Sequence, residues 1–386
     1  MNVAVVQNEI AYGGRLSVIV QIVRILNERN IVPDILTYRT DIIGRGIKDK
    51  YGEEIEFNVR TIESHYSRLP SEGSIMCFGM SLGRYKNNYD YFIDSNNTSF
   101  MMPKDIPTIS YVHFPRKARL MAKHVSIHNP EGIKRSWSRT SGIFLNLCRF
   151  FYLFNSKIGG KNLIIANSEF SRTNFKKCYP AYSANVSVIY PPVRIPTGRP
   201  IPLDKKENAV VSVGRFCPDK NQFRQVLLAQ QVPDMKFHIV GFCGQENDVF
   251  DGCRQYVEDH NLRNVFLHPH VDDERKSELL DRSKYFIHTT VNEPFGISTV
   301  EAILRGCIPL SHDSGGQKEI VILDELRYNN IEDLVGFFQR KTSEATLEKW
   351  SEKLMTHCRQ FCVDNFRRKV SEVLTNLESD IVRGTV

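Results

Sequence analysis

Two glutamates eight residues apart frame a segment suited to holding a phosphate with attached hydroxyl groups. Glu293 and Glu301 flank the turn Phe295–Ile297, and Ser298 is expected to begin a helix. A helix start exposes backbone N–H groups at the positive end of the helix dipole, which favours an anion. Carboxylates before and inside that helix can accept hydrogen bonds from ligand hydroxyls. The same residues also fit a capping box, in which Glu301 would satisfy only a backbone donor.

Two cations and a glycine pair occur where they could contact the phosphates of the same ligand. Arg215 leaves an expected strand through Gly214, and Lys220 follows five residues later at an expected helix start. Two cations at the carboxyl end of a strand can clamp a diphosphate, although isolated loop cations are often only solvated. The pair Gly315-Gly316 follows another expected strand. There it permits close backbone approach to a ligand, or merely a tight turn.

A second glycine pair lies near the N-terminus. Gly13 and Gly14 separate an expected strand from an expected helix in the segment AYGGRLS. A strand, a glycine turn and a helix start together suit a phosphate. The segment lacks both the G-x-G-x-x-G spacing and the lysine of a Walker loop, so it matches neither motif.

Together these segments resemble family 4 of the glycosyltransferases, which are retaining, nucleotide-sugar-dependent transferases of the GT-B fold. The spacing from Glu293 to Glu301 matches the E-x7-E signature, and GRFCPDKN resembles the motif G-R-x-x-x-x-K-N. NSEFSRTNF is similar to the N-S-x-F segment, and YGG to the N-terminal glycine turn. The segments YVHFP, YPPV and SHDSGGQKEIV resemble the mannosyltransferases that extend lipid-linked oligosaccharides, and their archaeal relatives.

The resemblance implies a role for each matching residue. Arg215 and Lys220 would neutralise the donor diphosphate, and Glu293 would bind hydroxyls of the donor sugar. His113 would approach the sugar from the N-terminal domain, with a satisfied histidine at a strand end as the alternative. The donor-binding residues implied are Gly13, Gly14, Glu301 at the ribose, Phe295, Gly296, Ile297, Ser298, Thr299, and Val271 near the base.

The donor implied by the resemblance is a nucleotide sugar, with GDP-mannose preferred and a UDP-sugar possible. The two cations would take the place of a metal ion, so neither a metal nor a cofactor is expected. The acceptor would be a glycan or a lipid-linked sugar, and the configuration of the transferred hexose would be retained.

These residues need parallel strands to bring them to one edge of a sheet. Short apolar runs alternate with helical patterns in both halves of the chain, which is typical of β-α-β units. Strands are expected in the first half at Asn2–Val6, Ile35–Tyr38, Ser74–Phe78, Tyr91–Ile93, Thr108–Val112, Asn162–Ala166 and Val186–Ile189. Strands are expected in the second half at Ala209–Val213, Lys236–Val240, Val265–Leu267, Tyr285–His288 and Ile308–Ser311.

A proline-rich segment divides the two halves. Five prolines occur among the fifteen residues Tyr190–Asp204, where neither a helix nor a central strand can form. We therefore expect an α/β protein with two Rossmann-like parallel-sheet domains that face a cleft. The N-terminal, acceptor-side domain would span residues 1–193 and the nucleotide-sugar-binding domain 194–365. Residues 366–386 would form a helix that returns to the first domain.

Composition and charge narrow the setting. Hydrophobic residues are 41% and charged residues 25% of the 386, and no apolar run reaches the roughly 18 residues of a spanning helix. The first residues show no secretory signal, and nine scattered cysteines are expected to be free thiols. We expect a cytoplasmic protein that can work at the cytosolic membrane face, without the N-terminal anchor of the eukaryotic enzymes it resembles.

Positive charge gathers in one segment. Between Pro115 and Lys177 there are 13 lysines and arginines against two acids, around the apolar run Ile143–Phe154. Basic residues beside aromatics suit a membrane interface better than a nucleic-acid groove, and a solvated basic surface is the other interpretation. No nucleic-acid partner is therefore expected.

Other functions fit the same fold. An epimerase or a sugar phosphorylase could use it, and so could a non-catalytic protein that binds nucleotide sugars. Donor turnover without transfer of the sugar would support the non-catalytic interpretation.

Overall fold

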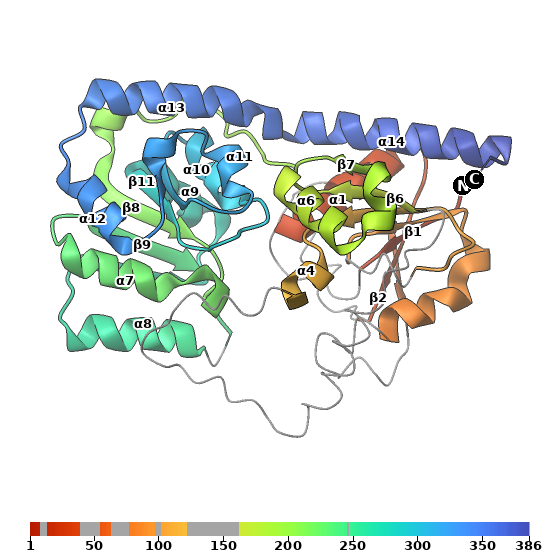
Figure 1. Cartoon of the computed structure of the whole chain (residues 1–386), viewed down its shortest axis with the longest axis horizontal. Helices are drawn as coiled ribbons and strands as arrows, with labels where there is room; N and C mark the ends of the chain where they lie inside the picture. The colour runs from red at the N-terminus through yellow and green to blue at the C-terminus, as the bar shows by residue number, and fades with distance from the viewer. Residues whose placement is uncertain are drawn as a thin grey trace. The chain divides into compact units, whose positions relative to one another are not determined.

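The computed structural model describes residues 1–7, 14–38, 55–62, 77–96, 102–121, 162–244 and 247–385 (Figure 1). These residues form two compact units. The N-terminal unit contains the described residues up to Pro192 and again from Val363 onward. The C-terminal unit contains the described residues of Val193–Cys362. Each unit is built on its own parallel sheet.

The N-terminal unit has a parallel sheet with the strand order β3-β2-β1-β4-β5-β6-β7. Its strands are β1 (Val3–Val6), β2 (Asp34–Thr37), β3 (Asn58–Thr61), β4 (Tyr91–Asp94), β5 (Thr108–Val112), β6 (Asn162–Ala166) and β7 (Val186–Val188). Its helices and 3₁₀ turns are α1 (Gly14–Asn27), η2 (Leu82–Asn88), α4 (Arg116–Met121), α6 (Glu169–Cys178), η5 (Pro180–Asn185) and α14 (Val363–Arg383).

Two differences from the sequence expectations occur in this sheet. The edge strand β3 has the polar sequence NVRT and is mostly exposed, so it carries no apolar signal that could have predicted it. Of the strand expected at Ser74–Phe78, residues 74–76 lie outside the described residues, and the expectation is wrong for Cys77 and Phe78, because residues 77–81 are helical. Phe78 is nevertheless buried, with its ring centroid 4.8 Å from that of Tyr38. Its hydrophobicity reflects a core contact made from a helical turn.

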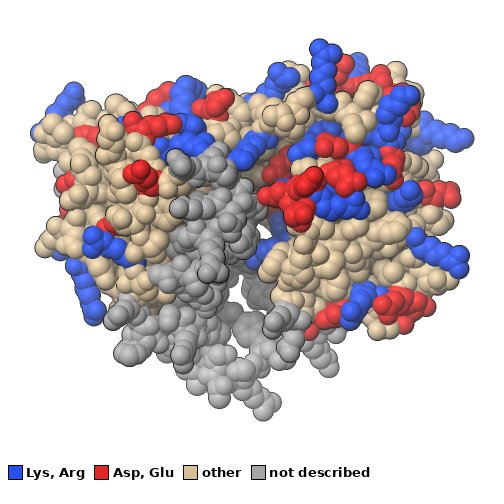
Figure 2. Space-filling model, turned by 180° about the vertical axis from the view of Figure 1, so that it is seen from behind, with Lys and Arg blue, Asp and Glu red and all other residues tan. Residues whose placement is uncertain are grey.

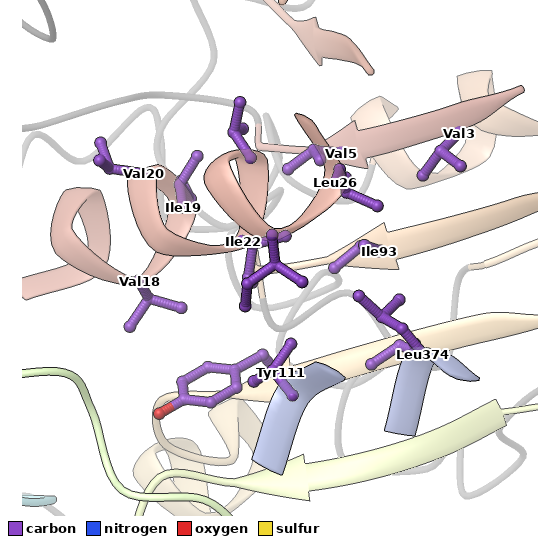
Figure 3. Close-up of a cluster of buried hydrophobic side chains, with 14 of the residues drawn as sticks. Val3, Val5, Val18, Ile19, Val20, Ile22, Leu26, Ile93, Tyr111 and Leu374 are labelled. Carbon is purple, nitrogen blue, oxygen red and sulfur yellow. The ribbon is translucent and has the colours of Figure 1, made fainter. Parts of the chain in front are cut away.

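Alternate residues of the strands fill two cores. Val3 and Val5 face a cluster that α1 and α14 cover, whereas Ala4 and Val6 face the opposite side of the sheet. Leu374 of α14 lies in the first cluster with Ile93 and Tyr111 (Figure 3). The last helix of the chain therefore completes the core of the N-terminal unit, as the sequence predicts.

The C-terminal unit has a parallel sheet with the strand order β10-β9-β8-β11-β12-β13. Its strands are β8 (Glu207–Val213), β9 (Lys236–Gly241), β10 (Val265–Pro269), β11 (Ser283–His288), β12 (Ile308–His312) and β13 (Arg327–Tyr328). Its helices are α7 (Gln222–Gln231), α8 (Asp248–Asp259), α9 (Asp273–Arg282), α10 (Ile297–Leu304), α11 (Gln317–Ile320), α12 (Ile331–Gln339) and α13 (Glu344–Cys358). Short 3₁₀ turns are η6 (Leu203–Lys205), η7 (Pro218–Lys220), η8 (Asp324–Leu326) and η9 (Arg359–Phe361).

Helices cover both faces of this sheet. Leucines of α9 and Ala302 of α10 share a buried cluster with Val211 and Val240. On the other face, the rings of Phe337 and Phe338 in α12 contact Tyr285 of β11 at centroid distances of 5.9 and 5.4 Å. Burial on both faces accounts for the continuous apolar runs of β8 and β12.

Most of the basic segment 115–177, including the apolar run 143–154, lies outside the described residues. On the face shown in Figure 2, basic and acidic side chains of the described residues are intermingled. Among the described helices, none is both long and apolar enough to cross a membrane. All eight cysteines in the described part of the chain are free thiols.

Candidate active site

The predicted donor-site residues of the C-terminal unit follow the carboxyl ends of its strands. Arg215 follows β8 and Val271 follows β10, while Glu293 lies in the connection from β11 to α10. The pair Gly315-Gly316 follows β12. Ligands of open parallel sheets bind at this edge, so the fold gathers side chains that are far apart in the sequence.

Lys220 and Glu293 form the central contact of the site. The Lys220 Nζ lies 2.7 Å from Glu293 Oε2, and both side chains are largely buried. Burial alone would raise the pKa of Glu293, but the hydrogen-bonded ammonium of Lys220 and the charge of Arg215 hold that pKa below its ordinary value. Glu293 is therefore an ionised carboxylate at neutral pH. Arg215 itself is exposed and forms no ion pair with a described residue.

His288 is a member of this site that the sequence analysis missed. Its Nε2 lies 3.8 Å from Glu293 Oε2, and the ring is 4% exposed at the end of β11. Burial first and the Lys220 charge second lower its pKa to about 4, so the imidazole is neutral at pH 7. Its Nδ1 has no hydrogen-bond partner among the residues that the structure describes. A histidine at the end of an apolar strand gives no sequence signal that separates it from a core residue.

The helix start behind Glu293 differs in detail from the prediction. Helix α10 begins at Ile297, one residue earlier than expected, and Gly296 precedes it with φ 113°. The N–H of Thr299 donates to the Gly296 carbonyl at 3.0 Å, so this predicted phosphate donor is already engaged. The N–H groups of Ile297 and Ser298 make no hydrogen bond to the described residues and remain as donors.

The capping-box alternative is wrong. Ser298 lies inside α10, and no side chain caps this helix. The Glu301 carboxylate instead faces Lys276 of α9, with 3.6 Å between Oε2 and Nζ. Glu301 therefore does not cap α10. Its contact with ribose hydroxyls stays a prediction.

Gly315 and Gly316 pack against the Glu293 loop itself. A Cβ atom on Gly315 would lie 2.5 Å from the Glu293 carbonyl oxygen, and one on Gly316 would lie 2.2 Å from that of Pro294. Gly315 also has φ 70°, and the Gly316 N–H donates to the Glu293 carbonyl at 2.7 Å. The glycine pair therefore allows two backbone segments to approach each other closely and fixes the loop that carries Glu293.

Phe295 is a structural anchor of the same loop. Its side chain is 2% exposed and packs edge-on against Phe361 at a centroid distance of 5.2 Å. Its carbonyl accepts a hydrogen bond of 3.2 Å from Gln317 Nε2. Because the ring is buried in the core, the predicted contact of Phe295 with a donor would involve its backbone.

Val271 lies at the other end of the sheet edge. It packs, partly buried, against the cluster that contains Val240. The neighbouring Phe242 ring is 54% exposed and contacts the His270 ring at a centroid distance of 4.8 Å. The predicted nucleobase site near Val271 would therefore include the exposed ring of Phe242.

In the N-terminal unit, His113 follows β5 and is held by a neighbour. Its Nε2 lies 3.1 Å from the Ser95 hydroxyl. Burial first, and then the charge of Arg15, lower its pKa well below the ordinary value, so the ring is neutral. This is the geometry of the satisfied histidine, and a contact with the donor sugar stays a prediction. Gly14 is the first residue of α1, whereas Gly13 lies outside the described residues.

No metal-binding cluster of three or more histidine, cysteine, aspartate or glutamate side chains occurs among the residues that the structure describes. The positive charges near Glu293 include those of Lys220 and Arg215. Such an arrangement can hold a diphosphate beside a carboxylate that accepts hydrogen bonds from hydroxyl groups.

The chain is similar in sequence and in fold to known glycosyltransferases. Residues 197–361 match the family described as "Glycosyl transferases group 1". The chain is 27% identical over 264 residues to the GDP-Man:Man(3)GlcNAc(2)-PP-Dol alpha-1,2-mannosyltransferase of Mus musculus, covering 61% of this chain and 53% of that protein. Identity to the enzyme of the same name from Homo sapiens is 27% over 276 residues, covering 64% and 54%. The chain spans about half the length of these curated relatives.

Solved structures are similar over nearly the whole chain. HepE of Anabaena in complex with UDP-glucose superposes with a TM-score of 0.70 at 18% identity, covering 97% of this chain and 100% of that one. Sucrose-phosphate synthase from Thermosynechococcus elongatus superposes with a TM-score of 0.73 at 15% identity, covering 98% and 99%. The architecture of two parallel-sheet units is the GT-B fold, and residues 197–361, which match the glycosyl transferases group 1 family, lie in its C-terminal unit.

Proposed function

We propose that this chain is a retaining glycosyltransferase that moves mannose from GDP-mannose to a lipid-linked oligosaccharide. The observation that carries the proposal is the buried contact between Lys220 and Glu293 at the carboxyl edge of the C-terminal sheet. The names of the curated relatives support the donor and the acceptor class. The alternatives are a nucleotide-sugar-binding protein, an epimerase and a phosphorylase.

The proposed chemistry begins with departure of the nucleoside diphosphate. Negative charge grows on the diphosphate as its bond to the sugar breaks, and fixed cations nearby stabilise that charge in the transition state. Lys220 and Arg215 would supply these cations in place of a metal ion. The N–H groups of Ile297 and Ser298 would add the positive end of α10.

Glu293 would act as an ionised acceptor of hydrogen bonds. Its pKa lies below the ordinary value, so it holds no proton to give a leaving group at neutral pH. It would bind hydroxyls of the donor sugar, and the three N–H donors of the Lys220 ammonium allow that ammonium to contact both Glu293 and a phosphate. Glu301 would bind the ribose hydroxyls.

Ligand-induced stabilisation tests the donor site first. We would follow thermal unfolding of the protein with GDP-, UDP- and ADP-sugars, without metal and then with magnesium. A ligand at about 100 times its dissociation constant stabilises by about 2.7 kcal/mol. A metal-independent shift that the Arg215→Ala/Lys220→Ala double variant loses would support the proposal, whereas no shift with any nucleotide sugar would contradict it.

Transfer itself needs a second assay. GDP-mannose and Man(3)GlcNAc(2)-diphospho-lipid, the acceptor that the relatives' name gives, would be incubated with the protein, and the product linkage would be read by NMR. An α-linked mannose supports retaining transfer. Donor turnover without sugar transfer would favour the non-catalytic or the other enzymatic alternatives.

We further propose peripheral attachment to a membrane through the basic segment 115–177, on the strength of its 13 basic and two acidic residues. Co-sedimentation with vesicles of phosphatidylcholine and phosphatidylserine tests this attachment. Binding that requires the anionic lipid and weakens with salt is the expected result. Equal recovery from pure phosphatidylcholine vesicles, or none from either, would contradict it.

A further inference from the structure

Three buried polar side chains connect the sheet of the C-terminal unit to the backbone of Lys220. The hydroxyl of Ser212 in β8 donates to Gln225 Oε1 in α7 at 2.6 Å. The Gln225 Nε2 donates to the Thr289 hydroxyl at 2.7 Å, and that hydroxyl donates to the Lys220 carbonyl at 2.7 Å. All three side chains are at most 5% exposed. We name them the Ser212–Gln225–Thr289 chain.

The direction of this chain is fixed by its last member. A backbone carbonyl only accepts, so the Thr289 hydroxyl must donate to Lys220 and accept from the Gln225 amide N–H. The Gln225 carbonyl oxygen is then left for the Ser212 hydroxyl. Each bond therefore orients the next, and hydrogen bonds in such a series strengthen one another in a buried setting.

The backbone at Lys220 depends on a contact from outside its own turn. Lys220 ends the three-residue turn η7, and Asn221 follows in the left-handed region with φ 54° before α7 begins. The Lys220 N–H donates within the turn to Cys217 at 3.0 Å, and its carbonyl is taken by Thr289. The hydroxyl of Thr289 therefore fixes the peptide plane from which the Lys220 side chain starts.

Lys220 is held at both ends by one segment. Thr289 and Glu293 both belong to the connection between β11 and α10, with Thr289 bound to the Lys220 carbonyl and Glu293 bound to its Nζ. A buried polar chain costs desolvation that an apolar core would avoid. A function in holding Lys220, to which the proposed function assigns the diphosphate, would explain why the protein keeps these buried polar side chains despite their desolvation cost.

We propose that Gln225 and Thr289 are positioning residues that set the Lys220 ammonium against the donor diphosphate. The inference rests on the proposed function, because it assigns the diphosphate to Lys220. Neither side chain touches the ligand. Misplacement of a catalytic group by about 1 Å can cost about a hundredfold in rate. The contact between the Lys220 ammonium and a phosphate depends on position in the same way, so loss of these hydrogen bonds is expected to weaken diphosphate binding.

The test measures the dissociation constant of GDP by calorimetry, without metal. Thr289→Val keeps the shape of the side chain and removes its hydroxyl, and we expect GDP binding to weaken on the order of tenfold. Thr289→Ser restores the hydroxyl and should restore most of the affinity. Gln225→Met interrupts the chain one step earlier and should reproduce the loss in a second variant.

A double-mutant cycle separates positioning from general stability. In the Lys220→Met background, Thr289→Val should cause no further loss of GDP affinity, because the group that it positions is gone. Ser283→Ala is the matched control, since Ser283 makes another buried hydroxyl-to-carbonyl bond of 2.7 Å at the opposite end of β11. This control should leave GDP affinity unchanged.

The outcomes distinguish the two proposals. Wild-type affinity in Thr289→Val, or an equal loss in both backgrounds, would overturn the positioning role while leaving the donor site intact. Wild-type affinity in Lys220→Met would instead remove the diphosphate from Lys220. Failure of the unchanged protein to bind GDP would overturn the donor assignment and the positioning role together.

Discussion

Lys220 and Glu293 form an ion pair in which both side chains are largely buried, with exposed fractions of 24% and 16%. We expect Lys220→Met to lower turnover of GDP-mannose by about 100- to 1000-fold, because one fixed charge in a site of this kind has an effect of that size. The buried Glu293 would lose its closest cation, so its pKa should also rise. Transfer of labelled mannose and NMR titration of Glu293 measure the two effects.

A second lysine provides the control for this prediction. Lys284 forms an ion pair with Glu344 at 3.3 Å and is 15% exposed in the same unit, at the opposite end of β11. Lys284→Met should keep full turnover. An equal loss in both variants would show that the effect reflects folding of the unit and not the site.

His288 makes stability depend on pH. Its pKa is about 4 in the folded protein, against 6.5 for an ordinary histidine. Between these two pH values, His288 binds a proton in the unfolded chain but not in the folded protein. The free energy of unfolding therefore falls as pH drops from about 6.5 to 4, by up to about 3 kcal/mol for this residue. Urea unfolding at intervals between pH 7 and 4 should show this decline. His288→Gln should make it shallower by the contribution of one histidine, because burial also lowers the pKa of His113 and His238.

His260 is the matched control, because it lies exposed at the surface, where its ring stacks on that of Tyr256. His260→Gln should keep the slope of the unchanged protein. The lowered pKa of Glu293 acts in a lower pH range, since the stability that it contributes is lost only as pH falls below the ordinary carboxylate range. An unchanged slope between pH 6.5 and 4 in His288→Gln would contradict the assignment to His288.

Glu301 and Ser298 should behave differently from a capping pair. Since no side chain caps α10, Ser298→Ala should change the free energy of unfolding by less than about 0.5 kcal/mol, where loss of a cap costs about 1 kcal/mol. Glu301→Gln should weaken GDP-mannose binding with a similarly small effect on stability. Paired calorimetry and urea unfolding check this, and a large loss of stability in Ser298→Ala would reinstate the cap.

At the scale of elements, the loop that carries Glu293 depends on the absence of side chains in the neighbouring loop. Gly315→Ala would place a Cβ within 2.5 Å of the Glu293 carbonyl, in a backbone conformation with φ 70° that alanine adopts only with strain. We expect displacement of the loop, loss of GDP-mannose binding and a destabilisation of about 1–3 kcal/mol. Calorimetry and thermal unfolding measure both.

Gly336 is the opposite case within the same unit. It lies in α12 with nothing within 4 Å of an added Cβ. Gly336→Ala should therefore stabilise by about 0.5–1 kcal/mol and leave ligand binding unchanged. Destabilisation of Gly336→Ala, or normal binding in Gly315→Ala, would contradict the opposite roles of the two glycines.

Elements with strong periodic patterns could be predicted from the sequence. The buried strands β8, β9 and β11 lie within two residues of their predicted bounds, because short continuous apolar runs between turns are typical of strands buried on both faces. The polar edge strand β3 gave no such signal, and the buried Phe78 gave a misleading one.

The site shows the same division. Lys220, Glu293 and the pair Gly315-Gly316 could be picked out by residue type and spacing, but each motif alone is weak, and only their joint resemblance to one family pointed to a single site. The role of His288 follows only from burial and a contact between β11 and the next loop. The Ser212–Gln225–Thr289 chain likewise depends on side-chain directions in three separate elements, which a linear pattern does not encode.

At the scale of the whole molecule, α14 belongs to the core of the N-terminal unit. Leu374 is fully buried among residues of β4 and β5, and Arg29 at the end of α1 forms an ion pair of 2.7 Å with Glu378. Leu374→Ala should lower the opening free energy of α1 and β1 amides by about 2–5 kcal/mol in hydrogen exchange. Val382→Ala, at a 77% exposed position of the same helix, should have no such effect. Unchanged protection in Leu374→Ala would contradict the structural role of the last helix.

On the ribosome, the N-terminal unit must wait for the last part of its own core. The 170 residues Val193–Cys362 are made between its two pieces, which takes roughly 10–30 s at about 5–20 residues per second. During that time the apolar face of α1 that α14 will cover stays open to chaperones and to aggregation. The described residues of the C-terminal unit all lie within Val193–Cys362, so this unit can fold before α14 is made. The N-terminal unit, although it is synthesised first, can complete its core only afterwards. A stop codon just before Val363 would release a chain whose C-terminal unit is complete and whose N-terminal unit lacks α14.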